Sequence, residues 1–168
     1  RQNVCLCAPT GKAQARLKEA LDHEVKNNLK LAADDPVRIR LENLSPLTIH
    51  RLLKTNPVTG ACGHNSGNPL LADTLVVDEV SMVDLPMLVR MLDAIPQGCR
   101  LILLGDKDQL AAVEIGAALV EMCEAWHDRP PVALLTRSHR FSADSGIGRL
   151  KDDVNRGAAV QAWEILSS

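Results

Sequence analysis

Two adjacent carboxylates, Asp78 and Glu79, directly follow the aliphatic run Leu75–Val77. An unalternating run rich in β-branched residues predicts a strand buried on both faces of a parallel sheet, and open α/β sheets bind ligands beyond the carboxyl ends of their strands. There, the first carboxylate would hold Mg²⁺, usually through water, and the second would orient the water that attacks a nucleotide's γ-phosphate. The structural alternative is that both acids cap the helix that follows, since carboxylates favour helix N-termini.

A second group suited to phosphate lies at Thr10–Lys12. The apolar segment 4–8 predicts a strand, and Thr10 is a plausible N-cap for a helix with Ala13, Leu17 and Leu21 on one face. A strand, a tight turn and a helix start would bring backbone N–H groups and the Lys12 ammonium to one point. The segment is not a Walker A loop, because the first glycine and the spacing of GxxxxGK[ST] are absent. A solvated lysine at a helix start remains the alternative for Lys12.

The next stretch contains a short helix and a turn-rich segment. Residues 48–54 predict a helix with Thr48 near its cap, and His50 and Arg51 are adjacent, so they cannot both face the core. A lone histidine is more often structural than a ligand. Residues 56–68 are dense in turn formers, so we expect residues 55–70 to form a flexible loop or an exposed hairpin.

The remaining pattern alternates strands and helices. Asp84 is expected to cap a helix that has Pro86 in its first turn. Its apolar face is expected to comprise Leu85, Leu88, Val89, Leu92 and Ile95. Further strands are expected at 101–104 and 132–135, and further helices at 115–125 and from Asp144 or Ser145 to a stop at Gly157. This alternation predicts an α/β fold with a parallel sheet flanked by helices.

Composition limits the class of protein. The 168 residues suffice for one domain, and 46% hydrophobic with 24% charged residues is ordinary for a globular protein. One Phe, two Trp and no Tyr imply an aliphatic core and argue against a base-stacking platform of aromatic rings. A net charge of −2 gives no overall basic footprint for nucleic acid, although a local basic edge is compatible with it.

The cysteines and the apolar runs bear on the compartment. The five cysteines, with no CxxC pair, are expected to be reduced core residues of a cytoplasmic protein. No apolar run reaches the roughly 20 residues of a membrane span, and no signal peptide opens the chain.

Five polar segments at expected strand ends occur in a characteristic order. They are APTGKAQARL (8–17), TIHRLL (48–53), VVDEVSMVD (76–84), LLGDKDQL (103–110) and SHRF (138–141). Together they resemble the first motor domain of superfamily one helicases, and most closely the RecD family, the alpha subunits of exonuclease V. The resemblance covers nearly the whole chain, and five motifs in order make it specific. It implies a RecA-like fold of the P-loop NTPase type, with ATP and Mg²⁺ as cofactors.

The resemblance also implies roles for individual residues. For the nucleotide, Asp78 would hold Mg²⁺, Glu79 would polarise the attacking water, Gln109 would sense the γ-phosphate and Arg140 would reach it. A salt bridge at a helix start is the structural alternative for Arg140. Asp106 would help couple the nucleotide state to the grip on DNA. Thr10, Lys12, Thr48 and His50 fall in motifs that contact single-stranded DNA, where their chemistry suits phosphate and sugar.

The chain also departs from the family pattern. The family's glycine-rich loop ending in Lys-Thr or Lys-Ser is expected upstream of Ala8, where only seven residues stand and none fits. The family's second motor domain is likewise expected to lie outside residues 1–168. We therefore expect residues 1–168 to be a partial RecA-like motor domain without its phosphate loop, close to inactive as an ATPase by itself.

The intact subunit is expected to be an ATP-dependent 5′-to-3′ DNA helicase of the exonuclease V recombination and repair complex. Its expected partners are single-stranded DNA and the other subunits of that complex. Two alternatives remain open from the sequence. One is a non-catalytic RecA-like module that docks to partner subunits, and the other is an ATPase that does not translocate on DNA.

Overall fold

The computed structural model describes residues 2–106, 117–125, 132–133, 135 and 146–167. The chain divides into two compact units, Arg1–Ala125 and Trp126–Ser168, and each is described by itself. The expectation of one motor domain over residues 1–168 stays a prediction.

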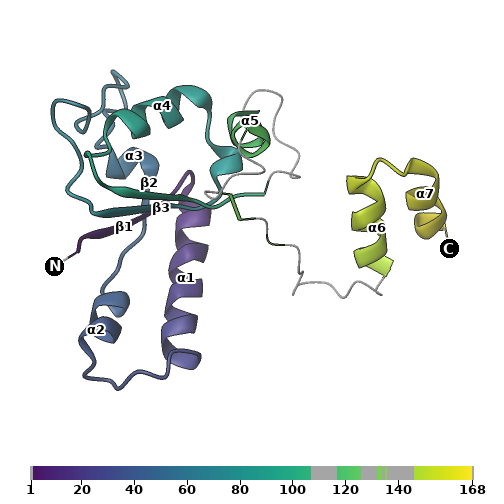
Figure 1. Ribbon diagram of the computed structural model, residues 1–168, viewed down its shortest axis with the longest axis horizontal. Helices are drawn as coiled ribbons and strands as arrows, with labels where there is room; N and C mark the ends of the chain where they lie inside the picture. The colour runs from purple at the N-terminus through teal and green to yellow at the C-terminus, as the bar shows by residue number, and fades with distance from the viewer. Residues whose placement is uncertain (1, 107–116, 126–131, 134, 136–145, 168) are drawn as a thin grey trace. The chain divides into compact units, whose positions relative to one another are not determined.

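The first unit is built on a four-stranded parallel sheet in the order β2-β1-β3-β4 (Figure 1). The strands are β1 (Val4–Ala8), β2 (Leu47–Thr48), β3 (Thr74–Val77) and β4 (Arg100–Leu103). The predicted α/β class with a helix-flanked parallel sheet is therefore confirmed. From β1 the chain adds β2 on one side and then β3 and β4 on the other. The order of the strands thus reverses between β1 and β3, which is where open α/β sheets form a ligand crevice.

The helices of this unit are α1 (Gly11–Asn27), α2 (Pro36–Glu42), α3 (Ile49–Leu52), α4 (Leu85–Asp93) and α5 (Ala117–Ala125), with a 3₁₀ turn η1 (Val80–Met82). In Figure 1, α1 and α2 lie on one side of the sheet, and α3 and α4 lie on the other. Three predicted caps are confirmed: the side chains of Thr10, Thr48 and Asp84 each accept a backbone N–H at the starts of α1, α3 and α4.

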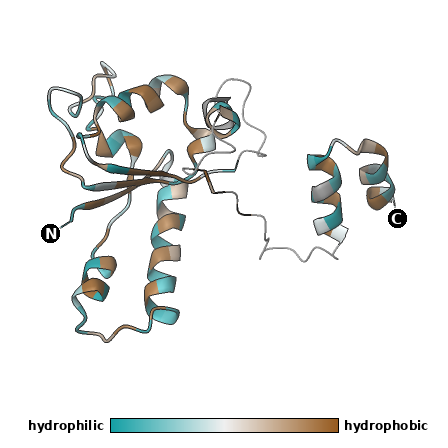
Figure 2. Ribbon diagram, in the orientation of Figure 1, coloured by the Kyte–Doolittle hydropathy of each residue, from teal (hydrophilic) through white to brown (hydrophobic). Residues whose placement is uncertain are grey.

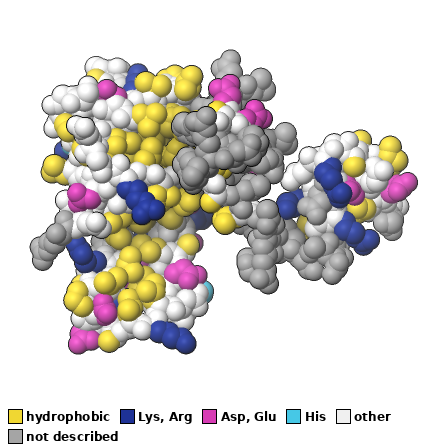
Figure 3. Space-filling view, viewed as in Figure 1, with side chains coloured by type: hydrophobic (Ala, Val, Ile, Leu, Met, Phe, Trp, Pro, Cys, Tyr) yellow, Lys and Arg dark blue, Asp and Glu magenta, His cyan; other side chains and the backbone are white. Residues whose placement is uncertain are grey.

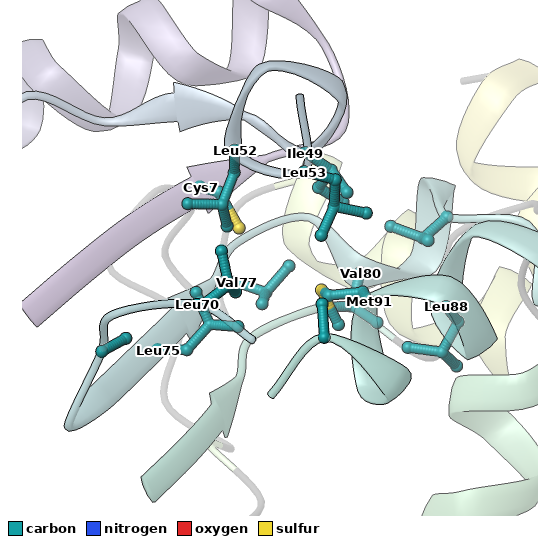
Figure 4. Packing of buried hydrophobic residues seen from close by; sticks show 13 residues of the cluster. Cys7, Ile49, Leu52, Leu53, Leu70, Leu75, Val77, Val80, Leu88 and Met91 are labelled. Carbon is teal, nitrogen blue, oxygen red and sulfur yellow. The ribbon is translucent and has the colours of Figure 1, made fainter. Parts of the chain in front are cut away.

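The core lies between the sheet and the helices α3 and α4 (Figure 4). The largest fully buried side chains there include Ile49 and Leu53 around α3, Leu75 and Val77 on β3, and Met91 on α4. All are aliphatic, as the scarcity of aromatic residues predicts. Figure 2 shows the strands as mainly hydrophobic and the long helix α1 as two-sided.

The apolar face expected for α4 is only partly correct. Leu88 is buried and Ile95 packs against the core, but Leu85, Val89 and Leu92 are 57%, 55% and 42% exposed. The helix instead buries Met91, which lies three residues after Leu88 on the same side. Leu85, Val89 and Leu92, which we call the α4 stripe, remain uncovered by the described residues. Hydrophobic atoms are visible over α4 in Figure 3.

Other element boundaries differ from those expected. The strand expected at 101–104 is β4 at Arg100–Leu103. A strand at 132–135 is wrong for the residues of that range that the structure describes, 132, 133 and 135, which have no regular structure. Helix α2 was not expected, although Asp35 caps it and Pro36 opens it. The helix expected at 115–125 is observed as α5 over its described part.

The turn-rich connection after α3 is tied to its surroundings by hydrogen bonds. It contains two isolated antiparallel bridges, Thr55–Cys62 and Asn65–Asn68. The guanidinium of Arg90 on α4 donates to the carbonyl of Gly60 at 2.9 Å. Asp93 accepts from the backbone N–H of Ser66 at 3.0 Å. The expectation of a flexible loop or hairpin at 55–70 stays a prediction, but these bonds give the segment a defined path.

The second unit contains α6 (Gly146–Asn155) and α7 (Ala159–Ser167), which pack against each other. Gly157, the expected helix stop, has a left-handed φ of 71° just after α6. The start of this helix expected at Asp144 or Ser145 lies outside the described residues. None of the described helices is both long and apolar enough to cross a membrane.

All five cysteines are free, as expected, but they are not equally buried. Cys7 on β1 is buried, and the others are half-buried. Burial raises the pKa of the Cys7 thiol to about 12, and the neighbouring Cys5 adds to this effect. The thiol of Cys7 is therefore protonated and unreactive at neutral pH.

Candidate active site and nucleic-acid interface

The strand register brings four chain segments to one edge of the sheet. Cys7 on β1 is paired with Val77 on β3, and the N–H of Asp78 donates to the Cys7 carbonyl at 2.9 Å. The N–H of Leu104 donates to the Val77 carbonyl at 2.8 Å, and Ala8 is paired with Thr48 on β2. Because all four strands are parallel, the residues that follow them meet at the same carboxyl edge.

The carboxylate pair occupies the centre of this edge. Asp78 and Glu79 are both half-buried, and Oδ1 of Asp78 accepts the N–H of Glu79 at 2.9 Å. Glu79 is in the left-handed region, with φ 54° and ψ 41°. A residue with a side chain is disfavoured there by about 1–2 kcal/mol, and such strain concentrates at functional sites.

The capping alternative for this pair is wrong for Glu79. Its side chain makes no capping hydrogen bond to the turn η1 that it precedes. Helix α4 is capped by Asp84, whose Oδ1 accepts the N–H of Met87 at 2.7 Å. The Glu79 carboxylate is therefore not required for helix formation.

The donor set of this turn fits Mg²⁺ chemically. Mg²⁺ prefers hard oxygen ligands and is held by one or two carboxylates while it keeps several of its waters. Asp78 retains oxygen lone pairs beyond the one bond to Glu79, and both carboxylates are partly open to water. A nucleotide needs a phosphate cradle as well, and no GxxxxGK[ST] segment occurs within the 168 residues.

Residues 78–82, which contain the two acids and η1, are called the carboxylate turn here. A pocket of about 110 Å³ lies beside this turn, since Met82 forms part of its lining. Its lining comes from the residues that follow β1, from the start of α3, and from the stretch that runs from the end of η1 into α4. The residues are Pro9, Thr10, Ile49, His50, Met82, Val83, Asp84 and Met87. Most of the lining is apolar, while a hydroxyl, an imidazole and a carboxylate supply the polar groups. A pocket of this composition suits a group with one apolar and one polar side, such as a sugar.

The structure brings together two of the four residues expected to bind DNA. Thr10 and His50 line the same pocket, whereas Thr48 and Lys12 do not. The hydroxyl oxygens of Thr10 and Thr48 accept the N–H groups of Ala13 and Arg51 at 3.2 and 3.3 Å. Each hydroxyl hydrogen can still donate to a phosphate or sugar oxygen.

Lys12 stands exposed in the first turn of α1, which contains no acidic residue. The N-terminus of a helix carries positive partial charge, so a lysine there lowers helix stability unless an anion is close by. Helix stability therefore does not account for its position, and its role in binding DNA stays a prediction. Asp106, three residues after the end of β4, is also exposed. Gln109 and Arg140 lie outside the described residues.

Sequence patterns did not single out Ser81 or the pocket residues that follow it. Ser81 is buried, and its hydroxyl has no hydrogen-bond partner within the described part of the chain. A serine between the apolar residues Val80 and Met82 was the only available signal. No role was predicted for Met82, Val83 or Met87.

A larger hollow of about 310 Å³ opens at the opposite, amino edge of the sheet. Its lining includes Asn3, Asp73 and Cys99, which precede three strands. Parallel sheets bind ligands at the other edge, and the described residues that line this hollow include no carboxylate pair and no phosphate-binding turn. The smaller pocket, which is lined by Met82 from the turn that follows Asp78 and Glu79, is therefore the better candidate site. No group of three or more potential metal ligands occurs among the residues that the structure describes.

Comparison with known proteins defines the class first. The sequence model of the AAA domain family matches residues 1–114, which include the whole sheet and the carboxylate turn. The chain therefore belongs to the AAA domain family, and its parallel sheet is consistent with a P-loop NTPase domain.

Curated relatives then specify the protein more closely. The chain is 43% identical over 166 residues to the RecBCD enzyme subunit RecD of Mycolicibacterium smegmatis. It is 37% identical over 195 residues to the same subunit of Haemophilus influenzae. These alignments cover 98% of this chain but only 28% and 30% of the relatives. The ATP-dependent RecD2 DNA helicase of Deinococcus radiodurans is 34% identical over 95% of this chain and 18% of its own. The chain is thus a homologue of RecD that spans less than a third of the length of these relatives.

Proposed function

We propose that this chain is part of the motor of an ATP-dependent DNA helicase subunit. The motor would move 5′ to 3′ along single-stranded DNA within a recombination and repair complex of the exonuclease V type. The observation that carries the proposal is the position of the carboxylate turn beside the Thr10–His50 pocket, at the point where the order of the strands reverses. Nucleotide chemistry and DNA contact would then share one rigid edge of the sheet.

At the nucleotide side, Asp78 would hold Mg²⁺ and Glu79 would orient the water that attacks the γ-phosphate. Mg²⁺, when bound, would neutralise negative charge on the phosphates. Glu79 is free for this task because Asp84 caps α4. By motif, Gln109 would sense the γ-phosphate and Arg140 would contact it. An arginine in this role typically contributes ~10³–10⁵ in rate.

At the DNA side, Thr10, Lys12, Thr48 and His50 would contact phosphate and sugar, which position a strand without reading its sequence. The starts of α1 and α3 supply these residues, and the pocket between them and α4 would take a sugar edge. Asp106, beyond β4, would help couple the nucleotide state to the grip on the strand. The partners would be single-stranded DNA and the other subunits of the complex, in the cytoplasm.

A non-catalytic docking module is the second candidate, and the α4 stripe favours it. Leu85, Val89 and Leu92 form an exposed apolar row on α4, and contiguous exposed apolar surface often marks a protein interface. In this alternative the acidic pair would have no hydrolytic role. A variant of the acidic pair that loses ATP turnover but still assembles with its partners would therefore favour the motor over the docking module.

The decisive experiment replaces Glu79 by Gln in the complete subunit, assembled with its partners. ATP hydrolysis is measured with and without single-stranded DNA. The motor proposal predicts DNA-stimulated turnover that falls at least about 10²-fold in Glu79→Gln, because a positioned base contributes ~10²–10⁴. Glu19→Gln, an exposed residue on α1, is the matched control and should retain turnover.

Each outcome has a defined meaning. Turnover without DNA stimulation would favour an ATPase that does not translocate. Absence of turnover in the unaltered complex would favour the docking module. We also propose that residues 1–168 alone hydrolyse ATP slowly, because they contain no phosphate loop, and turnover at the rate of the complete subunit would contradict this.

A further inference from the structure

Ser81 is the one buried polar side chain among the residues that the structure describes, with 6% exposure. It is the middle residue of η1, two positions after Glu79. Within the described residues its Oγ has no hydrogen-bond partner. A serine in a helical turn usually bonds to a carbonyl three or four residues earlier, but this one does not. A buried hydroxyl without a partner costs free energy and calls for an explanation.

The same turn carries a second unfavourable feature. Glu79, the residue before η1, has a left-handed φ of 54°, which residues with side chains rarely adopt. The turn is nevertheless held at both ends. The N–H of Val80 donates to the Leu104 carbonyl at 2.9 Å, and the N–H of Met82 donates to the Glu79 carbonyl at 3.0 Å. Two unfavourable features therefore lie within three residues of one turn.

The turn also connects the two halves of the proposed site. Glu79 lies at its start, while Met82 at its end lines the pocket that contains Thr10 and His50. Its bond to Leu104 joins it to the segment that leads to Asp106. A rearrangement of Glu79–Met82 would therefore change the direction of the carboxylate and the shape of the pocket together.

We infer that Ser81 is a positioning residue for Glu79. In the transition state of hydrolysis its hydroxyl gains a hydrogen bond to a backbone carbonyl of the turn, and this bond holds Glu79 in its hydrolytic orientation. The inference rests on the proposed ATPase function. The bond would favour the hydrolytic arrangement of the turn, because the hydroxyl has no partner among the described residues in the present arrangement and would be paired in the other. Ser81 is buried, so it acts through Glu79 and does not touch the nucleotide.

The test uses Ser81→Ala, Ser81→Cys and Ser81→Thr in the complete, assembled subunit. The measurements are kcat and KM for ATP with single-stranded DNA, and the thermal midpoint of the nucleotide-free protein. Ser81→Ala should lower kcat about 10-fold, the value of one hydrogen bond, with KM unchanged. The midpoint should not fall, because the Ser81 hydroxyl makes no hydrogen bond to the described residues. Ser81→Cys has a similar volume but a poor hydrogen-bond donor, so its kcat should be as low as that of Ser81→Ala. Ser81→Thr keeps the hydroxyl, so its kcat should be close to that of the unaltered protein.

Ser45→Ala, an exposed serine ahead of β2, is the matched control and should leave both measurements unchanged. An unchanged kcat in Ser81→Ala would overturn the inference. So would a fall in kcat that accompanies a lower thermal midpoint without recovery by Thr, because that pattern reports packing alone. If Glu79→Gln abolishes turnover while Ser81→Ala does not, the proposed function stands and only the role of Ser81 falls. Turnover that survives Glu79→Gln overturns the proposed function, and the role of Ser81 with it.

Discussion

Oδ1 of Asp78 accepts the backbone N–H of Glu79 at 2.9 Å, so the first carboxylate of the pair holds the backbone that carries the second. The bond forms where Glu79 takes up its left-handed conformation. The two acids thus differ in role within the turn. Asp78 stabilises the backbone through its side chain, and that backbone positions the side chain of Glu79.

The left-handed conformation leads to a prediction on stability. Glu79→Gly should be more stable than Glu79→Ala by about 0.5–1 kcal/mol in free energy of unfolding, because glycine adopts positive φ without the side-chain penalty. Urea denaturation of the two variants measures this difference. Both variants should lack ATP turnover in the complete subunit. Equal stability would show that the turn carries no backbone strain.

The position of Lys12 leads to a prediction on DNA binding. Lys12→Ala should weaken binding of single-stranded DNA and reduce the slope of log K against log salt by about 0.7, the value for one phosphate contact on a single strand. Lys26→Ala is the matched control, since it lies about 21 Å away in the last turn of the same helix. Similar losses in the two variants would argue for a diffuse electrostatic effect. Fluorescence anisotropy across a salt series distinguishes these results.

The burial pattern of α4 can be tested with two leucines. Leu88→Ala should lower the free energy of unfolding by about 2–5 kcal/mol, because it removes a buried side chain and leaves a cavity. Leu85→Ala, on the exposed α4 stripe, should change it by about 0.5 kcal/mol or less. In the assembled complex, a loss of assembly in Leu85→Ala would instead identify the stripe as an interface.

The conformation of the turn-rich segment 56–68 should depend on its two hydrogen bonds to α4. Replacing Arg90 and Asp93 together by Ala removes the bonds to Gly60 and Ser66. We expect faster proteolysis within this segment and a loss of about 1 kcal/mol or less per bond in global stability. Limited proteolysis with mass spectrometry locates the cleavage. An unchanged cleavage rate would show that the bridges within the segment suffice to hold it.

The Cys7 thiol should make stability fall at alkaline pH. Its pKa is raised to about 12 in the folded protein, against an ordinary value of 9.0, so the unfolded chain releases this proton first. Stability from this group is complete below pH 9.0 and decreases by up to about 1.4 kcal/mol per pH unit as pH rises toward 12. Cys7→Ala should show a shallower decline over that range. Urea titrations of both proteins at several pH values measure the difference, and parallel curves would contradict it.

The sequence predicted what local chemistry determines. Three N-caps were recognised, at Thr10, Thr48 and Asp84. A short side chain at this position can accept a hydrogen bond from a backbone N–H in the first turn of the helix. The two-residue strand β2 has no periodic signal, so it was not found. Helix α2 did have a local start signal, because Asp35 followed by Pro36 is a typical helix start.

The rest depended on contacts that are distant in sequence. Periodicity gave α4 a broad apolar face, but only packing decided that Met91 is buried and Leu92 exposed. For the site, the strand-end residues were predictable, whereas the pocket was not. It exists because β1 has β2 and β3 as neighbours, and that order places Met82 beside Thr10 and His50.

The central position of β1 and β3 also determines how this fold opens. Each is bonded on both sides, and the amides of Asp78 and Leu104 continue those ladders into the segments that follow. Such amides exchange with solvent water only when the sheet itself separates, whereas exposed turns exchange through small local openings. The carboxylates would therefore remain attached to the last part of the molecule to unfold, and partial unfolding elsewhere would leave their spacing intact.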